Sequence, residues 1–214
     1  MLKNNLIIFL KYPEAGKVKT RLGKSIGYEK AADIYSILIK HLISQLNDSN
    51  NYSVKIFYTP EERYEDISKW LNTDNLMPQE GNNLGERLSN AFYHSFTEGY
   101  SNTVVIGSDC IEITRDDINT AFNFLSTGYE TVIGPTNDGG YYLIGLSGKN
   151  YPELFQNIEW STNKVFSQTQ KIINQLQISS RILNYYNDID EISDINSNVI
   201  KIINSYNPDL RISI

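Results

Sequence analysis

Residues 103–110, TVVIGSDC, decide the fold class because an apolar stretch typical of a buried strand is followed directly by polar residues. The first four residues are β-branched, which is typical of a buried strand inside a parallel sheet. The run then stops, and Ser108 and Asp109 follow. Ligands of open α/β sheets bind at the carboxyl ends of the strands, so Asp109 is a candidate functional residue. The alternative is that Asp109 only caps the next turn.

Strands and helices alternate along the whole chain. The patterns predict strands or short extended pieces at 6–11, 54–59, 76–79, 103–108, 130–135, 141–146 and 180–183. They predict a loop at 12–27 and helices at 28–47, 60–70, 84–100, 114–127, 161–176 and 195–206, with Leu84, Tyr93 and Leu176 on inward faces. The alternation predicts an α/β three-layer sandwich with a mostly parallel sheet, in a single domain over residues 1–214.

Composition excludes several classes of protein. The chain has 214 residues and a formal net charge of −6, so no basic surface for nucleic acid is expected. Its one cysteine, Cys110, excludes internal disulfides and zinc sites built from several cysteines, and it suits a reducing compartment. The best apolar run, residues 6–10, is too short for a membrane span or a secretory signal. We therefore expect a cytoplasmic protein.

The loop after the first predicted strand is a candidate phosphate site. It gathers Lys17, Lys19 and Arg21 within five residues, although the chain as a whole is acidic. Arginine presents a fork that matches phosphate oxygens, lysine adds a point charge, and a loop of this kind can offer backbone N–H groups. Gly16 lies in the tight part of the loop, which matches neither a Walker loop nor GxGxxG. The alternative is an ordinary solvated basic loop.

Acidic residues follow the last predicted strand, at 187–191 (NDIDE). In a doubly wound sheet, Asp109 and this segment can meet at the same edge. Two carboxylates and phosphate oxygens form a hard, oxygen-rich site that suits Mg2+ or Mn2+. The alternative is that the carboxylates at 188–194 cap the next helix.

Two further motifs have both structural and functional interpretations. Asp138-Gly139-Gly140 lies between two apolar strands and predicts a hairpin turn, but paired glycines also let a backbone approach a ligand closely. Trp160 precedes a predicted helix cap at Ser161. It is either a core anchor or a platform for a sugar or a base.

Together the motifs resemble a known family. KYPEAGKVKTRL (11–22), NNLGERL (82–88), VVIGSDC (104–110), GPTNDGGYYLIGL (134–146), IEWST (158–162) and NDIDEISDI (187–195) occur in the order seen in the DUF2064 family. The resemblance covers roughly residues 6–195. These are GT-A-like proteins of the nucleotide-diphospho-sugar transferase superfamily, and some members are linked to arsenosugar biosynthesis or to radical-SAM gene neighbourhoods.

The resemblance implies a Rossmann-like GT-A sheet with one antiparallel strand near its edge, and a nucleotide across the first loop. It makes Asp109 and Asp190 the metal ligands, for Mg2+ or Mn2+. The residues expected to bind nucleotide or phosphate are Gly16, Lys17, Lys19, Arg21 and Ser108. Those expected to bind the acceptor or sugar are Asn83, Glu86, Arg87, Gly139, Gly140 and Trp160. The candidate catalytic residues are Lys19 and Arg21, which neutralise phosphate charge, and Asp138, as general base or acceptor binder.

The chain departs from the family pattern at three places. Ile111 replaces the usual Pro after SDC, Asn83 replaces the Asp before LGER, and Glu191-Ile192 replaces Thr-Pro. Asp109 and Asp190 are unaffected, whereas Asn83 could weaken a substrate contact.

The function expected from the resemblance is a metal-dependent glycosyltransferase that takes a nucleoside diphosphate sugar and a small-molecule acceptor. Two alternatives remain open. The Thr-Arg-Leu element also resembles the loop of 2-phospholactate guanylyltransferases, which implies nucleotidyl transfer with release of pyrophosphate. The other is a non-catalytic nucleotide-binding protein.

Overall fold

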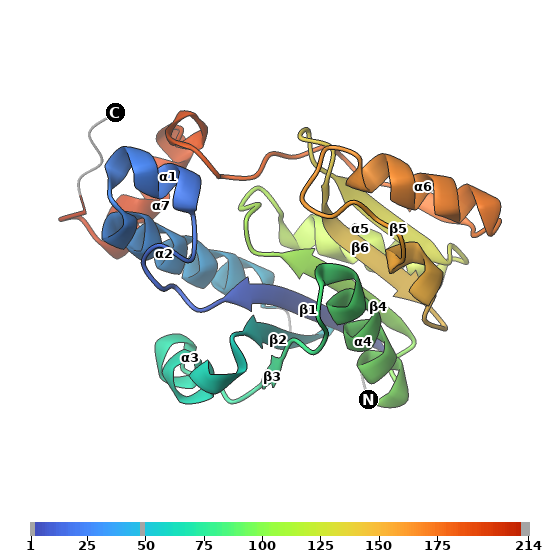
Figure 1. Cartoon of the computed structure of the whole chain (residues 1–214). Helices are drawn as coiled ribbons and strands as arrows, with labels where there is room; N and C mark the ends of the chain where they lie inside the picture. The colour runs from blue at the N-terminus through green and yellow to red at the C-terminus, as the bar shows by residue number, and fades with distance from the viewer. Residues whose placement is uncertain (1–2, 48–49, 211–214) are drawn as a thin grey trace.

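The computed structural model describes residues 3–47 and 50–210 and contains a seven-stranded sheet in the order β3-β2-β1-β4-β6-β5-β7 (Figure 1). The strands are β1 (Asn4–Lys11), β2 (Ser53–Thr59), β3 (Leu76–Pro78), β4 (Asn102–Gly107), β5 (Thr131–Pro135), β6 (Tyr141–Ser147) and β7 (Ser180–Ile182). Each lies within two residues of its predicted bounds. Strand β6 is antiparallel to both β4 and β5, and the other pairs are parallel, as predicted.

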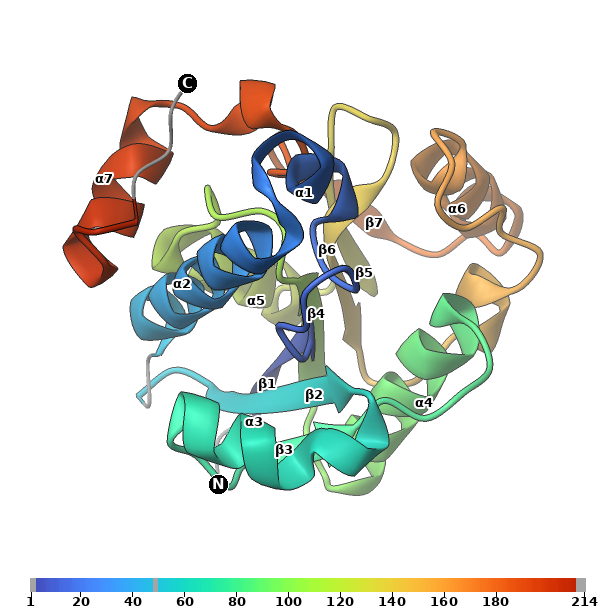
Figure 2. The same ribbon diagram turned by 60° about the vertical axis from the view of Figure 1, so that its left-hand side comes forward.

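The helices are α1 (Thr20–Ile26), α2 (Tyr28–Leu46), α3 (Tyr64–Leu71), α4 (Leu84–Thr97), α5 (Arg115–Ser126), α6 (Val165–Gln175) and α7 (Ser197–Tyr206), with 3-10 turns η1 (Glu61–Arg63), η2 (Pro152–Phe155) and η3 (Ile192–Asp194). Figure 2 shows the sheet between α2 and α7 on one side and α4 and α6 on the other. The predicted three-layer α/β sandwich is confirmed. The predicted domain range, 1–214, includes residues 1–2, 48–49 and 211–214, which lie outside the described part.

Side chains alternate between the two faces of the sheet along each central strand. Leu6 and Ile8 of β1 pack in a cluster with α2 and α5, whereas Ile7 and Phe9 pack with α4, η2 and α6. Successive side chains of a strand point to opposite faces of the sheet, and here both faces are covered by apolar residues. The sequences of these strands are therefore continuous hydrophobic runs. The central strands are therefore rigidly held, and their carboxyl ends form a fixed edge.

The last helix packs on the first two. Leu22 of α1, Ile34 and Leu38 of α2, and Val199 and Ile203 of α7 share one apolar cluster. In Figure 1 the red α7 lies beside the blue α1 and α2. Helix α1, which follows the cationic loop, is thus packed in one apolar cluster with α2 and α7.

Several predicted local structures differ from the observed ones. The predicted loop at 12–27 contains α1, which has only seven residues, too few for a helical pattern to stand out. Ser161 does not cap a helix, because it adopts a left-handed backbone with φ of 63° and α6 begins at Val165. Leu84, Tyr93 and Leu176 are exposed, Tyr93 by 64%, so their predicted inward placement is wrong. Apolar residues at helical spacing also occur on solvated faces.

The cap of α5 matches the prediction. The Thr114 side chain accepts the N–H of Asp117, and the Asp117 carboxylate accepts the N–H of Thr114. Such a reciprocal capping box fixes the first turn of the helix. Pro60 is followed by η1 before α3, rather than by one continuous helix. No helix in the described residues has the length and apolar character that spanning a membrane requires.

Candidate functional site

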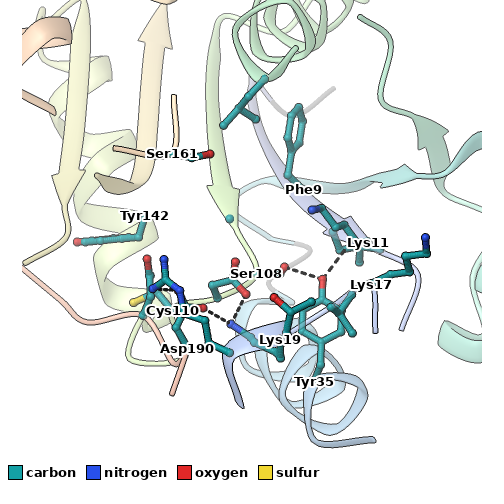
Figure 3. A pocket seen from close by; sticks show the side chains of 18 of the residues that line it. Phe9, Lys11, Lys17, Lys19, Tyr35, Ser108, Cys110, Tyr142, Ser161 and Asp190 are labelled. Carbon is teal, nitrogen blue, oxygen red and sulfur yellow. Dashed lines mark hydrogen bonds and ion pairs between the residues drawn. The ribbon is translucent and has the colours of Figure 1, made fainter. Parts of the chain in front are cut away.

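A cleft of about 660 Å³ lies at the carboxyl ends of β1 and β4. Its walls come from the loop after β1, the residues after β3 and β4, the first turn of α4, the start of β6 and the segment after β7. Figure 3 shows Lys19, Ser108 and Asp190 converging on it from three of these segments. The lining includes seven predicted site residues: Lys17, Lys19, Arg21, Arg87, Ser108, Asp109 and Asp190.

Lys19 occupies the centre of the acidic part of the cleft. Its Nζ forms an ion pair with Oδ1 of Asp109 and lies 3.2 Å from Oδ1 of Asp190. The Lys19 side chain is 3% exposed, whereas those of Asp109 and Asp190 are 50% and 42% exposed. Burial alone would lower the pKa of Lys19, but the two carboxylates raise it above its ordinary value. The ammonium group is therefore charged.

The backbone of Lys19 is unusual. It adopts a left-handed conformation with φ of 44° immediately before α1. A residue other than glycine is uncommon there and is held by its surroundings. Here the buried Val18 and Leu22 flank the position. The conformation directs the Lys19 side chain to the carboxylates rather than to solvent.

Other cations lie at the rim of the cleft. A guanidinium nitrogen of the exposed Arg21 is 3.6 Å from Oδ2 of Asp190. Lys11 and Lys17 also line the cleft, and neither has an ion pair with another described residue. Opposite charges thus surround one cavity, with carboxylates on one side and free cations on the other. Such a rim attracts a polyanion such as a diphosphate.

A buried tyrosine ties the two strand ends together. The Tyr35 hydroxyl lies 3.0 Å from Oγ of Ser108 and accepts the backbone N–H of Lys11 at 3.0 Å. Burial, and then the charge of Asp109, raise the pKa of Tyr35, so its hydroxyl keeps its proton. Lys11 ends β1 and Ser108 follows β4. Tyr35 therefore fixes the floor of the cleft.

The acidic segment after β7 returns to the cleft. The N–H of Ile189 donates to the carbonyl oxygen of Asp109 at 3.0 Å. Asp194 only stabilises this segment, because its carboxylate accepts the N–H groups of Asp190 and Glu191 at 2.9 and 2.8 Å. Asp188 also lines the cleft. Burial, and then the charges of Asp109 and Asp138, raise the pKa of Asp188 to about 7.

The Asp-Gly-Gly turn is stabilised by hydrogen bonds within the turn and does not line the cleft. Oδ1 of Asp138 accepts from the hydroxyl of Thr136 at 2.5 Å and from the N–H of Gly140 at 3.1 Å. Gly139 has φ of 92°, and a Cβ there would overlap the carbonyl oxygen of Asn163. The hairpin interpretation is confirmed, since β5 and β6 pair on either side. The close backbone approach at Gly139 is to Asn163.

Four of the six residues predicted to bind the acceptor line one of two cavities, whereas Gly139 and Gly140 line neither of them. Arg87 lines the main cleft and donates from Nε to the carbonyl oxygen of Gly81 at 3.0 Å. Asn83, Glu86 and Trp160 line a second hollow of about 580 Å³ between α4 and η2. Neither cavity includes Gly16, which lies in the turn before Lys17 with φ of 76°.

The contacts in the second hollow are mainly structural. The Asn83 side chain accepts the N–H of Glu86 at 2.9 Å and thereby caps α4. The carboxylate of Glu86 accepts the N–H of Asn82 at 2.8 Å. The Trp160 ring packs edge-on against Tyr141 at 6.3 Å, and lies against Gly85. Trp160 is therefore part of the packing as well as of the wall of this hollow.

Sequence reasoning missed three residues that shape the main cleft, Lys11, Tyr35 and Gln79, whereas Asp188 lies in the acidic segment 187–191 that it had singled out. The spacing of apolar residues in the helix places Tyr35 on its buried face, but this spacing does not reveal the partner of the Tyr35 hydroxyl. Gln79 follows β3, and its amide donates to carbonyl oxygens of Leu10 and Phe57 at 3.1 and 2.9 Å. Its position at the end of the predicted extended piece, 76–79, is the available clue.

The carboxylates have a donor set suited to a hard divalent cation. Oxygens of Asp109 and Asp190 converge on one point, which Lys19 Nζ contacts. Mg2+ commonly takes one or two protein carboxylates and completes its shell with phosphate oxygens and water. Among the residues that the structure describes, no group of three or more His, Cys, Asp or Glu side chains is arranged to hold a metal. The residues present therefore fit an ion shared with a bound phosphate.

Residues 42–162 match a family model described as "Uncharacterized protein conserved in bacteria (DUF2064)". The chain belongs to the DUF2064 family. A structure from Desulfovibrio desulfuricans G20, provisionally described as a nucleotide-diphospho-sugar transferase, shares 30% sequence identity with this DUF2064 chain. The match covers 96% of this chain and 99% of that one, with a TM-score of 0.86. A comparison with curated proteins finds no match.

More distant structures share the fold. A cytidylyltransferase from Leptospira borgpetersenii is 13% identical, with a TM-score of 0.56 and coverage of 100% of this chain and 99% of that one. Glucosyl-3-phosphoglycerate synthase from Mycobacterium tuberculosis, in complex with Mg2+ and UDP, is 13% identical. That match has a TM-score of 0.50 and covers 94% and 78% of the two chains. The DUF2064 chain therefore has the fold of nucleotide-diphospho-sugar and nucleotidyl transferases.

Proposed function

We propose that this protein is a divalent-metal-dependent glycosyltransferase that uses a nucleoside diphosphate sugar. The observation that carries the proposal is the position of Lys19 between Asp109 and Asp190, in a cleft whose rim holds free cations. This arrangement supplies carboxylates for a hard cation and positive charge for two phosphates. The description of the Desulfovibrio relative, and the Mg2+ and UDP bound to the glucosyl-3-phosphoglycerate synthase, support the same chemistry.

Each group then has a role in stabilising the departing nucleoside diphosphate. Asp109 and Asp190 would hold Mg2+ or Mn2+, which supplies charge neutralisation at the phosphates when it is bound. Lys17, Lys19 and Arg21 neutralise the remaining charge from the first loop, with Gly16 giving the loop its turn. Ser108 is positioned by Tyr35 to donate to a phosphate oxygen. Fixed charges of this kind need no rearrangement as negative charge develops.

The acceptor is a small molecule that enters from the side of the cleft formed by Arg87 and the start of β6, next to the β5–β6 turn. Asp138 is the candidate base, because one of its oxygens is fixed by Thr136 and Gly140 and the residue is exposed. Asn83, Glu86, Gly139, Gly140 and Trp160 shape the surface next to this entry. We also propose that the reaction takes place in the cytoplasm.

Nucleotidyl transfer is the second candidate, and the cations at the end of β1 and in the loop after it favour it. Lys11, Lys17 and Arg21 together could also accommodate a triphosphate. In that reaction an acceptor phosphate would attack the α-phosphorus and pyrophosphate would leave. The cytidylyltransferase fold match is compatible with this chemistry.

Thermal unfolding tests the choice. The protein is heated with and without Mn2+ in the presence of nucleoside diphosphate sugars, free diphosphates or triphosphates, and Asp109→Asn serves as the matched control. A ligand at about one hundred times its Kd adds about 2.7 kcal/mol, which raises Tm by several degrees for a chain of this size. A Mn2+-dependent shift with one diphosphate sugar, absent in Asp109→Asn, supports glycosyl transfer.

Product analysis completes the test. Release of a nucleoside diphosphate supports glycosyl transfer, and release of pyrophosphate supports nucleotidyl transfer. Binding without either product leaves a non-catalytic nucleotide-binding protein. A chain whose Tm does not respond to any nucleotide contradicts all three.

A further inference from the structure

We propose that Lys19 occupies the cation position between Asp109 and Asp190 until a nucleotide arrives, so that its ammonium and a divalent ion compete for the same carboxylate oxygens. The inference rests on the proposed function, because it concerns the metal ion of that reaction. It adds an order of binding: nucleotide first or together with metal, and not metal alone.

The contacts leave little room for two cations. Lys19 Nζ approaches Oδ1 of both carboxylates, and Arg21 faces Oδ2 of Asp190. A divalent ion binds carboxylate oxygens at about 2.0–2.6 Å, and the ammonium group already contacts the same two Oδ1 atoms. An ion shared by the two Oδ1 atoms would therefore overlap the ammonium hydrogens, and the two positive charges would repel each other at contact distance.

Lys19 also approaches the carboxylates from inside the protein. Its side chain is almost fully buried, its backbone is fixed at the start of α1, and its Nζ lies 6.0 Å from the centre of the Tyr35 ring. The carboxylates are half-exposed on the side of the cleft. A metal ion reaches them from the cleft, where it meets an ion pair that is already formed.

A phosphate group resolves the competition. The cleft that contains Lys19 also contains Lys17 and Arg21, so an anion bound there faces all three cations. Contact with a diphosphate gives the ammonium a second partner and releases carboxylate oxygens for the ion. The same diphosphate adds its own oxygens to the metal site. Both effects make metal affinity depend on nucleotide.

The test measures Mn2+ binding to the nucleotide-free protein by titration calorimetry and by the electron paramagnetic resonance signal of free Mn2+. Wild type is compared with Lys19→Met, which keeps the length of the side chain without its charge. The matched control is Lys17→Met, which removes one positive charge from the rim of the same cleft. We expect Lys19→Met to bind Mn2+ at least about tenfold more tightly than wild type, and Lys17→Met to change the affinity by less than about twofold.

Two further variants keep the test sharp. Lys19→Gln retains a hydrogen-bond donor. Its circular dichroism spectrum and Tm show whether the protein still folds when the side chain at position 19 is neutral. Asp109→Asn in the Lys19→Met background removes one of the two carboxylates, and we expect it to abolish the gain in Mn2+ affinity. A gain that survives Asp109→Asn overturns the proposal.

The outcomes separate the inference from the proposed function. Tight Mn2+ binding by nucleotide-free wild type, unchanged in Lys19→Met and Lys19→Gln, overturns the competition but leaves the metal-dependent reaction in place. Equal gains in Lys19→Met and Lys17→Met show a general effect of net charge and also overturn it. Absence of Mn2+ binding in every variant, even with a nucleoside diphosphate present, contradicts the proposed metal dependence and the inference together.

Discussion

The hydroxyl of Tyr35 lies 3.0 Å from Oγ of Ser108, and this contact joins helix α2 to the residue that follows the central strand. The same hydroxyl accepts the N–H of Lys11. One phenol thus sets the spacing between the ends of β1 and β4, the two strands whose loops carry the candidate phosphate and metal residues.

Tyr35→Phe removes both contacts and leaves buried polar groups without a partner. We expect unfolding free energy to fall by about 1–3 kcal/mol and nucleotide affinity to fall about fivefold. Thermal unfolding and calorimetric titration measure the two effects. Tyr58→Phe is the matched control, because the Tyr58 hydroxyl donates to the carbonyl oxygen of Glu61 away from the cleft. Equal losses of affinity in both variants would contradict the role assigned to Tyr35.

Arg21→Met removes a cation that faces both the cleft and Asp190. We expect the affinity for a nucleoside diphosphate to fall about tenfold at low salt, because a charged contact to phosphate is lost. The loss shrinks as salt is added, since Arg21 is exposed and its charge is screened. Lys24→Met is the control, because Lys24 lies in the last turn of α1 and does not line the cleft. Calorimetric titration at two salt concentrations decides between them.

Gly139→Ala tests the packing of the hairpin turn. The substitution places a Cβ against the carbonyl oxygen of Asn163 at a positive φ, so we expect a loss of about 2 kcal/mol or more in unfolding free energy. Gly128→Ala has a similar φ, 109°, but its Cβ meets nothing within 4 Å. It should lose only about 1 kcal/mol. Denaturant unfolding of both variants separates backbone strain from overlap, and identical losses would exclude the overlap.

Glu130→Gln tests a carboxylate far from the cleft. A hydrogen bond from Tyr151, followed by one from the N–H of Ser179, lowers the pKa of Glu130. A carboxyl whose pKa is lower in the folded state stabilises the protein above its unfolded pKa, and this stabilisation is lost as pH falls through the folded pKa.

We therefore expect Glu130→Gln to lower Tm by about 2–4 °C at pH 7, equivalent to about 1 kcal/mol, and the difference from wild type to shrink below about pH 4. Thermal unfolding from pH 3 to pH 8 measures this. Glu62→Gln, at an exposed position of η1, should match wild type throughout. A difference that grows towards low pH would reverse the sign and contradict the assignment.

The sheet could be predicted because its strands carry strong local signals. The β-branched run at residues 103–106 and the apolar run at 6–10 are buried on both faces of the sheet. They can therefore be recognised as strands without knowing which side chains point to which face. Thr114 and Asp117 likewise specify the start of α5 through contacts only three residues apart. Such features depend on neighbours in sequence.

The parts that could not be predicted depend on distant partners. Helix α1 is short, and it is stabilised by packing of Leu22 against α2 and α7 rather than by its own pattern. Asp188 and Asp190 are alternate members of one acidic loop, and no periodicity distinguishes a cleft residue from a cap there. The left-handed backbone of Lys19 belongs to a residue type that seldom adopts it, so the central ion pair had no signal in sequence.

The ion pair between Lys19 and Asp190 spans 171 positions of the chain. During translation Lys19 leaves the ribosome early, whereas Asp190 is added roughly 10 to 30 seconds later at bacterial-type elongation rates of about 5–20 residues per second. A nascent chain of this protein therefore carries the cationic loop, without Asp190 to pair with it, for most of its synthesis. During this interval cellular polyphosphates and nucleotides can meet the loop before Asp190 and the acidic segment around it exist.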